Sequence, residues 1–106
     1  MRRGDVYWYS FQAPDKRRPV MVLTRDSAIP ILDSVTVAPV TTTVRGIPTE
    51  VELTRDDGMP QPCAANFDNL QTVAKQRLGE HITRLSPQRL AEAAAAISFA
   101  LGLDDT

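Results

Sequence analysis

The segment from Val35 to Leu53, VTVAPVTTTVRGIPTEVEL, constrains the fold more than any other part of the chain. Its first half is dense in valine and threonine, whose branched side chains favour an extended strand over a helix. Residues 45–48 interrupt the strand, because glycine permits a positive φ and proline cannot donate a hydrogen bond to a ladder. Beyond the break, Thr49, Val51 and Leu53 alternate with carboxylates and share one face. The segment predicts a strand, a turn where we expect chemistry, and a half-exposed strand.

Short extended segments separated by turn residues recur in the rest of the chain. Residues 5–11 are dense in aromatic side chains that alternate between two faces, as in a strand. The run 20–24 is apolar without interruption, which is typical of a strand covered on both faces. Further strands are expected within 62–67, 70–73 and 81–85, a helical turn at 75–78, and polar loops at 12–17, 26–33 and 54–61.

A helix is predicted at the C-terminal end. Ser86 is a favourable N-cap, Pro87 suits the first helical position, and Gly102 supplies a stop. An apolar stripe at helical spacing is formed by Leu90, Ala94, Ile97 and Leu101. Together these elements predict a mainly β (α+β) fold in one domain spanning residues 1–106.

The composition is that of a folded globular chain, with 42% hydrophobic and 24% charged residues. No apolar run approaches the roughly 20 residues that cross a membrane, and the N-terminus lacks the pattern of a signal peptide. The single cysteine, Cys63, excludes an internal disulfide. It fits a reducing compartment, and we expect the cytoplasm.

The charge is unevenly distributed although the net charge is only −1. Residues 1–25 hold six basic and two acidic residues, whereas the remainder holds six basic and eleven acidic residues. This asymmetry is consistent with a local phosphate-binding patch and equally with chance clustering of surface charge. In the same way, the aromatic residues of 5–11 suit either the stacking of unpaired bases or a small core.

Several kinds of active site are excluded by the motifs that the sequence lacks. There is no Gly-rich phosphate loop, no Cys-x-x-Cys pair and no His-Glu-x-x-His. One cysteine and one histidine are too few for a zinc site, so we expect no metal or cofactor, and His81 is interpreted as a surface or strand residue. Arginine beside threonine hydroxyls suits a phosphate whose charge grows in a transition state. Arg18 is placed for this role at a strand entrance, just before Pro19.

Seven blocks follow one another in a characteristic order along nearly the whole chain. They are RRGDVY (2–7), RRPV (17–20), VAPVT (37–41), RGIPTEV (45–51), NFDNLQTV (66–73), RLG (77–79) and RLSP (84–87). This ordered set resembles the MazF/PemK toxin family. The resemblance implies a compact SH3-like β-barrel with a short helix near 75–78 and a C-terminal helix, acting as a homodimer.

The resemblance also implies an activity and a partner. Members of the family are sequence-specific endoribonucleases that cut single-stranded RNA without a metal, leaving a 2′,3′-cyclic phosphate and a 5′-OH. A cognate MazE-like antitoxin inhibits them by covering the RNA groove. Two alternatives on the same barrel stay open: a CcdB-like gyrase poison and a non-catalytic SH3-like binding module. The chain ends LDDT and lacks the C-terminal Trp-Gly-Ile of the gyrase poisons.

The resemblance places the family's catalytic arginine at Arg18 and its catalytic threonine at Thr41, and matches Asp68 to an acidic position of the site. Residues expected to contact RNA are Arg17, Thr42, Thr43, Arg45 and Asn66. The chain departs from the family in its short 12–17 loop and in Asn66, where some relatives have a basic residue. Arg18 stays charged at neutral pH, so it is assigned charge stabilisation and the proton acceptor is left unassigned.

Overall fold

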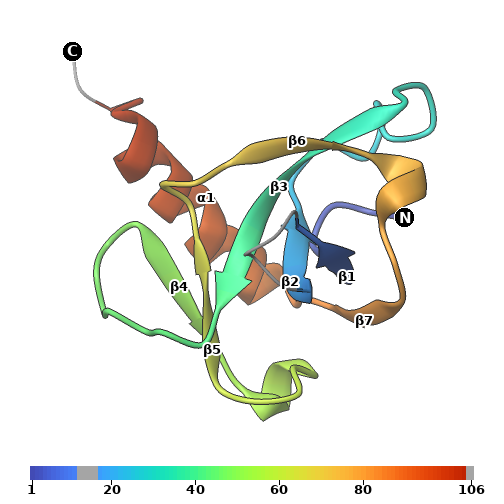
Figure 1. The fold of residues 1–106 in the computed structure, drawn as a ribbon. Coiled ribbons are helices and arrows are strands. Elements are labelled where there is room, and N and C mark those ends of the chain that lie inside the picture. The colour runs from blue at the N-terminus through green and yellow to red at the C-terminus, as the bar shows by residue number, and fades with distance from the viewer. Residues whose placement is uncertain (12–16, 105–106) are drawn as a thin grey trace.

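The computed structural model describes residues 1–11 and 17–104 and confirms the mainly β fold with one C-terminal helix (Figure 1). The strands are β1 (Asp5–Ser10), β2 (Arg17–Val22), β3 (Ser34–Thr41), β4 (Glu50–Leu53), β5 (Cys63–Asn66), β6 (Gln71–Ala74) and β7 (His81–Arg84). The helices are α1 (Pro87–Leu101) and two single 3₁₀ turns, η1 (Arg55–Asp57) and η2 (Lys75–Arg77). Apart from Arg17, the loop predicted at 12–17 lies outside the described residues.

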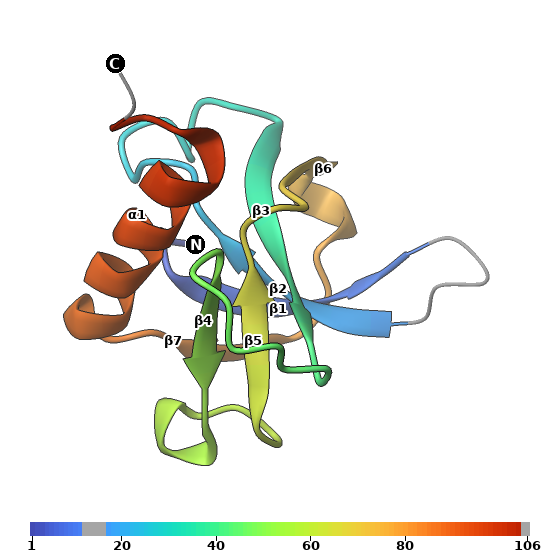
Figure 2. The ribbon, with the colours of Figure 1, turned by 90° about the vertical axis from the view of Figure 1, so that its left-hand side faces the viewer.

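The strands form one curled antiparallel sheet, a half-barrel with the order β4-β5-β3-β2-β1-β7. The sixth strand, β6, leaves this path and pairs with the first half of β3. The helix α1 lies beside β4 at one edge of the sheet (Figure 2). Every strand expected from the sequence is present, although β2 begins at Arg17 instead of Val20. Its added residues pair with β1, the preceding strand, and the apolar pattern of β2 by itself does not reveal this pairing.

Strand β3 is the axis of the fold because it changes partner twice along its length. Its residues 34–37 pair with β6, residues 37–39 pair with β2, and Val40 and Thr41 pair with β5. The strand ends at Thr41, so the rest of the threonine run, Thr42 and Thr43, lies outside the ladder. This single strand therefore joins the two halves of the curled sheet.

Apolar side chains gather on both faces of β2, as its uninterrupted apolar pattern predicts. Met21 contributes to a core with α1, β4 and β5, whereas Val20 and Val22 contribute to a second core under β6. All three side chains are buried. In β1 the alternation also holds, since Val6 enters the first core and Tyr9 the second.

The turn and strand that follow β3 match their prediction. Thr49, Val51 and Leu53 are buried on one face, and Glu52 is exposed on the other. Gly46 has a φ of 68°, a left-handed conformation that glycine adopts without steric cost. The turn therefore leaves the sheet and returns to it as β4 with the expected face inward.

The ends of α1 match the prediction, but its buried stripe was predicted wrongly at two positions. The hydroxyl of Ser86 accepts from the Arg89 N–H at 3.2 Å, and Gly102 ends the helix with a φ of 65°. The buried residues are Ala93 and Ala96, with Leu90, Ile97 and Ala100 packed partly against the first core. Ala94 and Leu101 are exposed. Small alanines allow the helix to approach the sheet closely, so α1 contacts the sheet through its alanines and not through the larger Leu101.

Among the described residues, no helix is long and apolar enough to cross a membrane, and α1 has only 15 residues.

A buried carboxylate, Asp5, ties β1 to β7. Arg84 donates from Nε to Asp5 Oδ1 at 2.8 Å, His81 Nε2 lies 3.1 Å from the same oxygen, and the Arg2 N–H donates to Oδ2 at 2.7 Å. Burial alone would raise the pKa of Asp5, but these hydrogen bonds outweigh it and lower the pKa from 3.8 to about 2. His81 lies in β7 with its ring edge against Tyr7, which confirms its interpretation as a strand residue.

We predict that Asp5→Asn lowers the free energy of unfolding at neutral pH by about 2 kcal/mol. Because the folded-state pKa is lowered, this stabilisation is fully present above about pH 4 and is lost as the pH falls to about 2. Urea unfolding at a series of pH values measures it, with the exposed Asp56→Asn as control. An acid-unfolding profile of Asp5→Asn that overlays the native one would contradict this role.

Candidate active site

A groove opens where the ladder between β2 and β3 stops. The last pair of this ladder joins Val20 to Pro39, and the next position along β2 is Pro19. Neither proline has an N–H to donate, so the ladder loses donors on both strands at this point. From Val40 onward β3 pairs with β5 instead. The two strands therefore separate here without leaving a long run of unpaired donors.

The separation places Arg18 and Thr41 on the two sides of the groove. If the register of Val20 with Pro39 continued for two residues, Arg18 would lie directly opposite Thr41. Three hollows follow the opening, with volumes of about 430, 230 and 160 Å³. We name them the Trp8 hollow, the Phe11 hollow and the Asn66 hollow, each after a residue that lines it. Arg18 lines all three, and Thr41 lines the first and the third.

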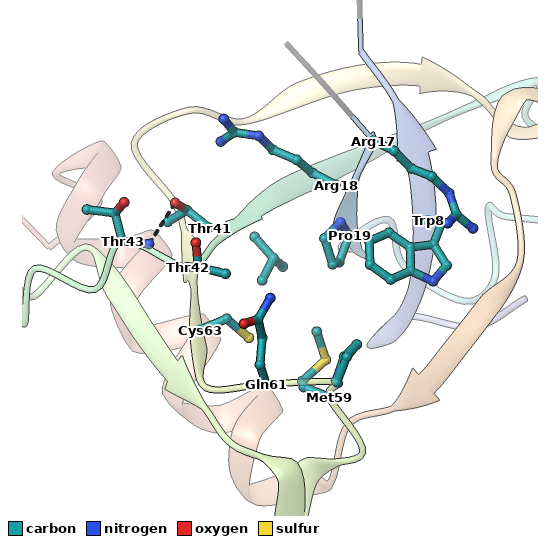
Figure 3. Close-up of a pocket in the computed structure, with 12 residues that line it drawn as sticks. Trp8, Arg17, Arg18, Pro19, Thr41, Thr42, Thr43, Met59, Gln61 and Cys63 are labelled. Carbon is teal, nitrogen blue, oxygen red and sulfur yellow. Dashed lines mark hydrogen bonds between the residues drawn. The ribbon is translucent and has the colours of Figure 1, made fainter.

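The guanidinium of Arg18 is available for an anion. The side chain is exposed and extends from β2 toward the side of the groove where Thr41 lies (Figure 3). Residues 1–11 and 17–104 form no ion pair and no side-chain hydrogen bond with it. A planar cation without a carboxylate partner fits the oxygens of a phosphate, two at a time.

The hydroxyl of Thr41 is oriented by the backbone that follows it. Its Oγ1 accepts from the Thr43 N–H at 3.1 Å, the dashed contact in Figure 3. A threonine hydroxyl has one hydrogen and two lone pairs, so this bond leaves its O–H free to donate. Thr42 and Thr43 line the Trp8 hollow beside it. The threonine cluster therefore gives one oriented donor and two exposed hydroxyls.

The aromatic residues of β1 divide between the core and the groove. Tyr9 is buried in the second core, with Tyr7 and Phe11 packed against it. Trp8 points the other way and lines the Trp8 hollow, where the Arg17 guanidinium lies 4.4 Å from the centre of its ring. The core reading is therefore confirmed for Tyr9 and its neighbours. The stacking of an unpaired base on Trp8 stays a prediction.

The wall opposite Arg18 comes from the segment between β4 and β5, which the sequence predicted only as a connector. Met59, Pro60 and Gln61 line the Trp8 hollow from this side, together with Cys63 at the start of β5. Cys63 is buried, and burial, followed by the charge of Asp57, raises the pKa of its thiol. The thiol is therefore part of the wall and is poorly suited to act as a nucleophile.

The Asn66 hollow contains the predicted RNA-contacting residues Arg45 and Asn66, together with Glu50. Glu50 accepts from the Arg45 N–H through Oε1 at 2.9 Å, while its Oε2 is buried without a partner among the described residues. Of the described residues that line the three hollows, Glu50 is the one carboxylate. The sequence did not reveal Glu50 as a site residue, because its position in an alternating strand indicated only a surface carboxylate.

Asp68 lies apart from the three hollows. Its carboxylate accepts from the Thr49 hydroxyl at 2.6 Å, and its N–H donates to Asn66 Oδ1 at 2.8 Å. Asp68 thus contacts the site through Asn66 and the start of β4. The other predicted site residues, Arg17, Arg18, Thr41, Thr42, Thr43, Arg45 and Asn66, each line at least one hollow. In the described part of the chain, no group of three or more His, Cys, Asp or Glu side chains is placed to bind a metal ion.

We predict that Arg17→Ala changes the environment of Trp8 without unfolding the protein. Trp8 is the only tryptophan of the chain, so its emission reports on this hollow alone. Removal of the guanidinium exposes one side of the ring, so we expect a red shift and stronger quenching by acrylamide. Stability should change by no more than about 0.5–1 kcal/mol. Arg55→Ala is the matched control, and an equal response in both variants would contradict the contact.

The chain matches the family described as PemK-like, MazF-like toxin of type II toxin-antitoxin system over residues 2–101. It is 41% identical over 103 residues to the probable endoribonuclease MazF2 of Mycobacterium tuberculosis, covering 96% of this chain and 99% of the relative. It is 46% identical over 90 residues to the endoribonuclease MazF3 of the same organism, covering 85% and 87%.

Solved structures of such toxins have the same fold. The Mycobacterium tuberculosis toxin MazF-mt6 superposes with a TM-score of 0.84 at 40% identity, covering 92% of this chain and 96% of that chain. A mycobacterial endoribonuclease in complex with its cognate antitoxin gives a TM-score of 0.87 at 27% identity, covering 97% and 96%. The chain therefore belongs to the family of PemK-like and MazF-like toxins of type II toxin–antitoxin systems.

Proposed function

We propose that this chain, an endoribonuclease of the MazF-like toxins, cleaves single-stranded RNA at specific sequences through the 2′-OH of the substrate and without a metal ion. The 2′-oxygen forms a bond to the adjacent phosphorus, and the bond from phosphorus to the 5′-oxygen breaks. A base removes the 2′-proton and the 5′-oxygen gains one, leaving a 2′,3′-cyclic phosphate and a 5′-OH. The observation that carries the proposal is that Arg18, which has no ion-pair partner among residues 1–11 and 17–104, faces the oriented hydroxyl of Thr41 across an open groove.

Arg18 and Thr41 act on the charge that grows on the phosphate oxygens. The Arg18 guanidinium binds the phosphate, and its attraction strengthens as the phosphorus becomes five-coordinate and more negative. The free O–H of Thr41 donates to one of the same oxygens. The strand β2 fixes the backbone of Arg18, and the Thr43 N–H orients the hydroxyl of Thr41. Preorganised donors of this kind act mainly on the rate of the chemical step.

The remaining predicted RNA contacts extend the groove on both sides of Arg18. Arg17, Thr42 and Thr43 line the Trp8 hollow, while Arg45 and Asn66 line the Asn66 hollow. The bound RNA strand therefore runs past Arg18, with one nucleotide on each side of this arginine. Arginine contacts to backbone phosphates hold such a strand in register, and polar contacts to its unpaired bases select sequence.

A MazE-like antitoxin is the proposed inhibitor, and a homodimer the proposed assembly. The antitoxin proposal is supported by the mycobacterial endoribonuclease that was solved with its cognate antitoxin.

The homodimer proposal is supported by exposed apolar side chains at the end of α1. Phe99, Leu101 and Leu103 leave a surface that a second copy can cover. Light scattering of the purified chain tests the dimer, and RNA cleavage with and without the antitoxin tests inhibition.

We predict that Arg18→Ala and Thr41→Ala each slow cleavage about 100-fold or more, since each removes a donor to the developing charge. A long mixed-sequence RNA is incubated with each protein in EDTA, and the new ends are mapped and analysed for 5′-OH groups. Arg55→Ala, an exposed arginine outside the groove, is the control. Undiminished cleavage by both variants would contradict the site. No cleavage by the folded native protein would favour a gyrase poison or a binding module.

We further predict that Glu50→Gln reduces cleavage more than Asp68→Asn. Both substitutions keep an oxygen that can accept the existing hydrogen bond, so the fold is preserved. Asp68, the acidic residue predicted from the family pattern, is bonded to Thr49, whereas Glu50 lines the same hollow as Arg18 and Thr41. Loss of a proton acceptor costs about 10²–10⁴-fold in rate and removes the acidic limb of the pH–rate profile. If Asp68→Asn loses this activity and Glu50→Gln does not, then Asp68 is the base.

A further inference from the structure

The Trp8 hollow is larger than a phosphate site requires. Its volume is about 430 Å³, and Arg18 and Thr41 line only one side of it. The rest of the lining mixes polar side chains, such as Thr42 and Gln61, with the apolar side chains of Trp8, Pro19, Met59 and Pro60. Flat apolar side chains next to a phosphate-binding arginine suit an unpaired nucleobase, because every base has a π face and carries its own phosphate beside it.

Trp8 is held in place for such a contact. The side chain is half-buried, and the Arg17 guanidinium covers its ring at 4.4 Å from the centre. The strand β1 fixes its backbone through pairing of Trp8 with Pro19. A ring that is already oriented loses little conformational freedom when a base packs against it.

Gln61 is the polar side chain that projects into this hollow from the far wall (Figure 3). The side chain is exposed, and its amide forms no hydrogen bond with residues 1–11 and 17–104. An amide offers a donor and an acceptor side by side, the arrangement that pairs with two neighbouring atoms on the edge of a base.

The backbone around Gln61 is stiff for a connecting segment. Pro60 and Pro62 flank it and restrict φ at their own positions, and each also biases the residue before it toward an extended conformation. Buried side chains, Met59 and Cys63, anchor the two ends of this short span. The amide is therefore presented from a fixed backbone, as a residue that discriminates between bases requires.

We propose that Gln61 is a specificity-determining residue that reads the edge of the nucleobase next to the cleaved phosphate, while Trp8 packs against that base. The inference rests on the proposed function and identifies which side chain selects sequence at one position of the substrate. Gln61 contacts the base and takes no part in proton transfer, so its removal broadens the choice of cutting sites and leaves the chemistry intact.

The test compares cutting sites of native protein, Gln61→Ala and Gln61→Glu on a random-sequence RNA library. In Gln61→Ala we expect discrimination at one position adjoining the cut to fall about tenfold or more, with other positions unchanged. In Gln61→Glu the donor is lost, so preference at that position should move toward guanine, whose edge offers two neighbouring donors. Gln88→Ala, exposed on α1, is the matched control and should keep the native pattern.

The possible outcomes separate the inference from the proposed function. An active Gln61→Ala with the native site preference would overturn the inference alone. Loss of cleavage at all sequences in Gln61→Ala would overturn it as well, because a residue that only reads a base does not act on every site equally. No cleavage by the native protein would overturn the proposed function, and this inference with it.

Discussion

The site depends on the point where β2 and β3 cease to pair. Backbone N–H and C=O groups of adjacent strands normally continue their ladder, and ending it leaves polar groups without partners. Here Pro19 and Pro39 remove two of the donors, and β5 provides a new partner for Val40 and Thr41. The strands can therefore separate at low cost, and Arg18 and Thr41 are left facing an open groove on a rigid sheet.

Arg84 and Arg89 differ from Arg18 in having carboxylate partners. Arg84 and Arg89 are bonded to the carboxylates of Asp5 and Asp57, and they fasten β7 to β1 and α1 to η1. These carboxylates have lowered pKa values because the hydrogen bonds outweigh the burial that would raise them. Arg18, in contrast, has no carboxylate partner among the described residues. The ion pairs of Arg84 and Arg89 therefore lie away from the groove, whereas Arg18 lines it.

The sequence predicted what local pattern determines and missed what depends on contacts between elements. Alternation in β4 predicted which side chains are buried, and the caps at Ser86 and Gly102 predicted the ends of α1. The early start of β2 was missed because it depends on β1, and the stripe of α1 was misplaced because alanines set the approach of the helix. At the site, the ordered family blocks led to Arg18 and Thr41. Gln61 lies in none of these blocks, and Glu50 lies in one of them but was given no role. The sequence could not reveal either residue, because each reaches the groove only when its strand or connector has folded against it.

In the proposed reaction the RNA supplies its own nucleophile, the 2′-OH, and Arg18 and Thr41 stabilise the negative charge that grows on the phosphate oxygens. The most direct measurement uses a short RNA with one preferred cutting site and replaces the single 2′-OH at that site by hydrogen. We expect that this RNA binds but is not cut there, while the unmodified RNA is cut in EDTA. Cleavage of the 2′-deoxy RNA at the same bond and a similar rate would contradict it.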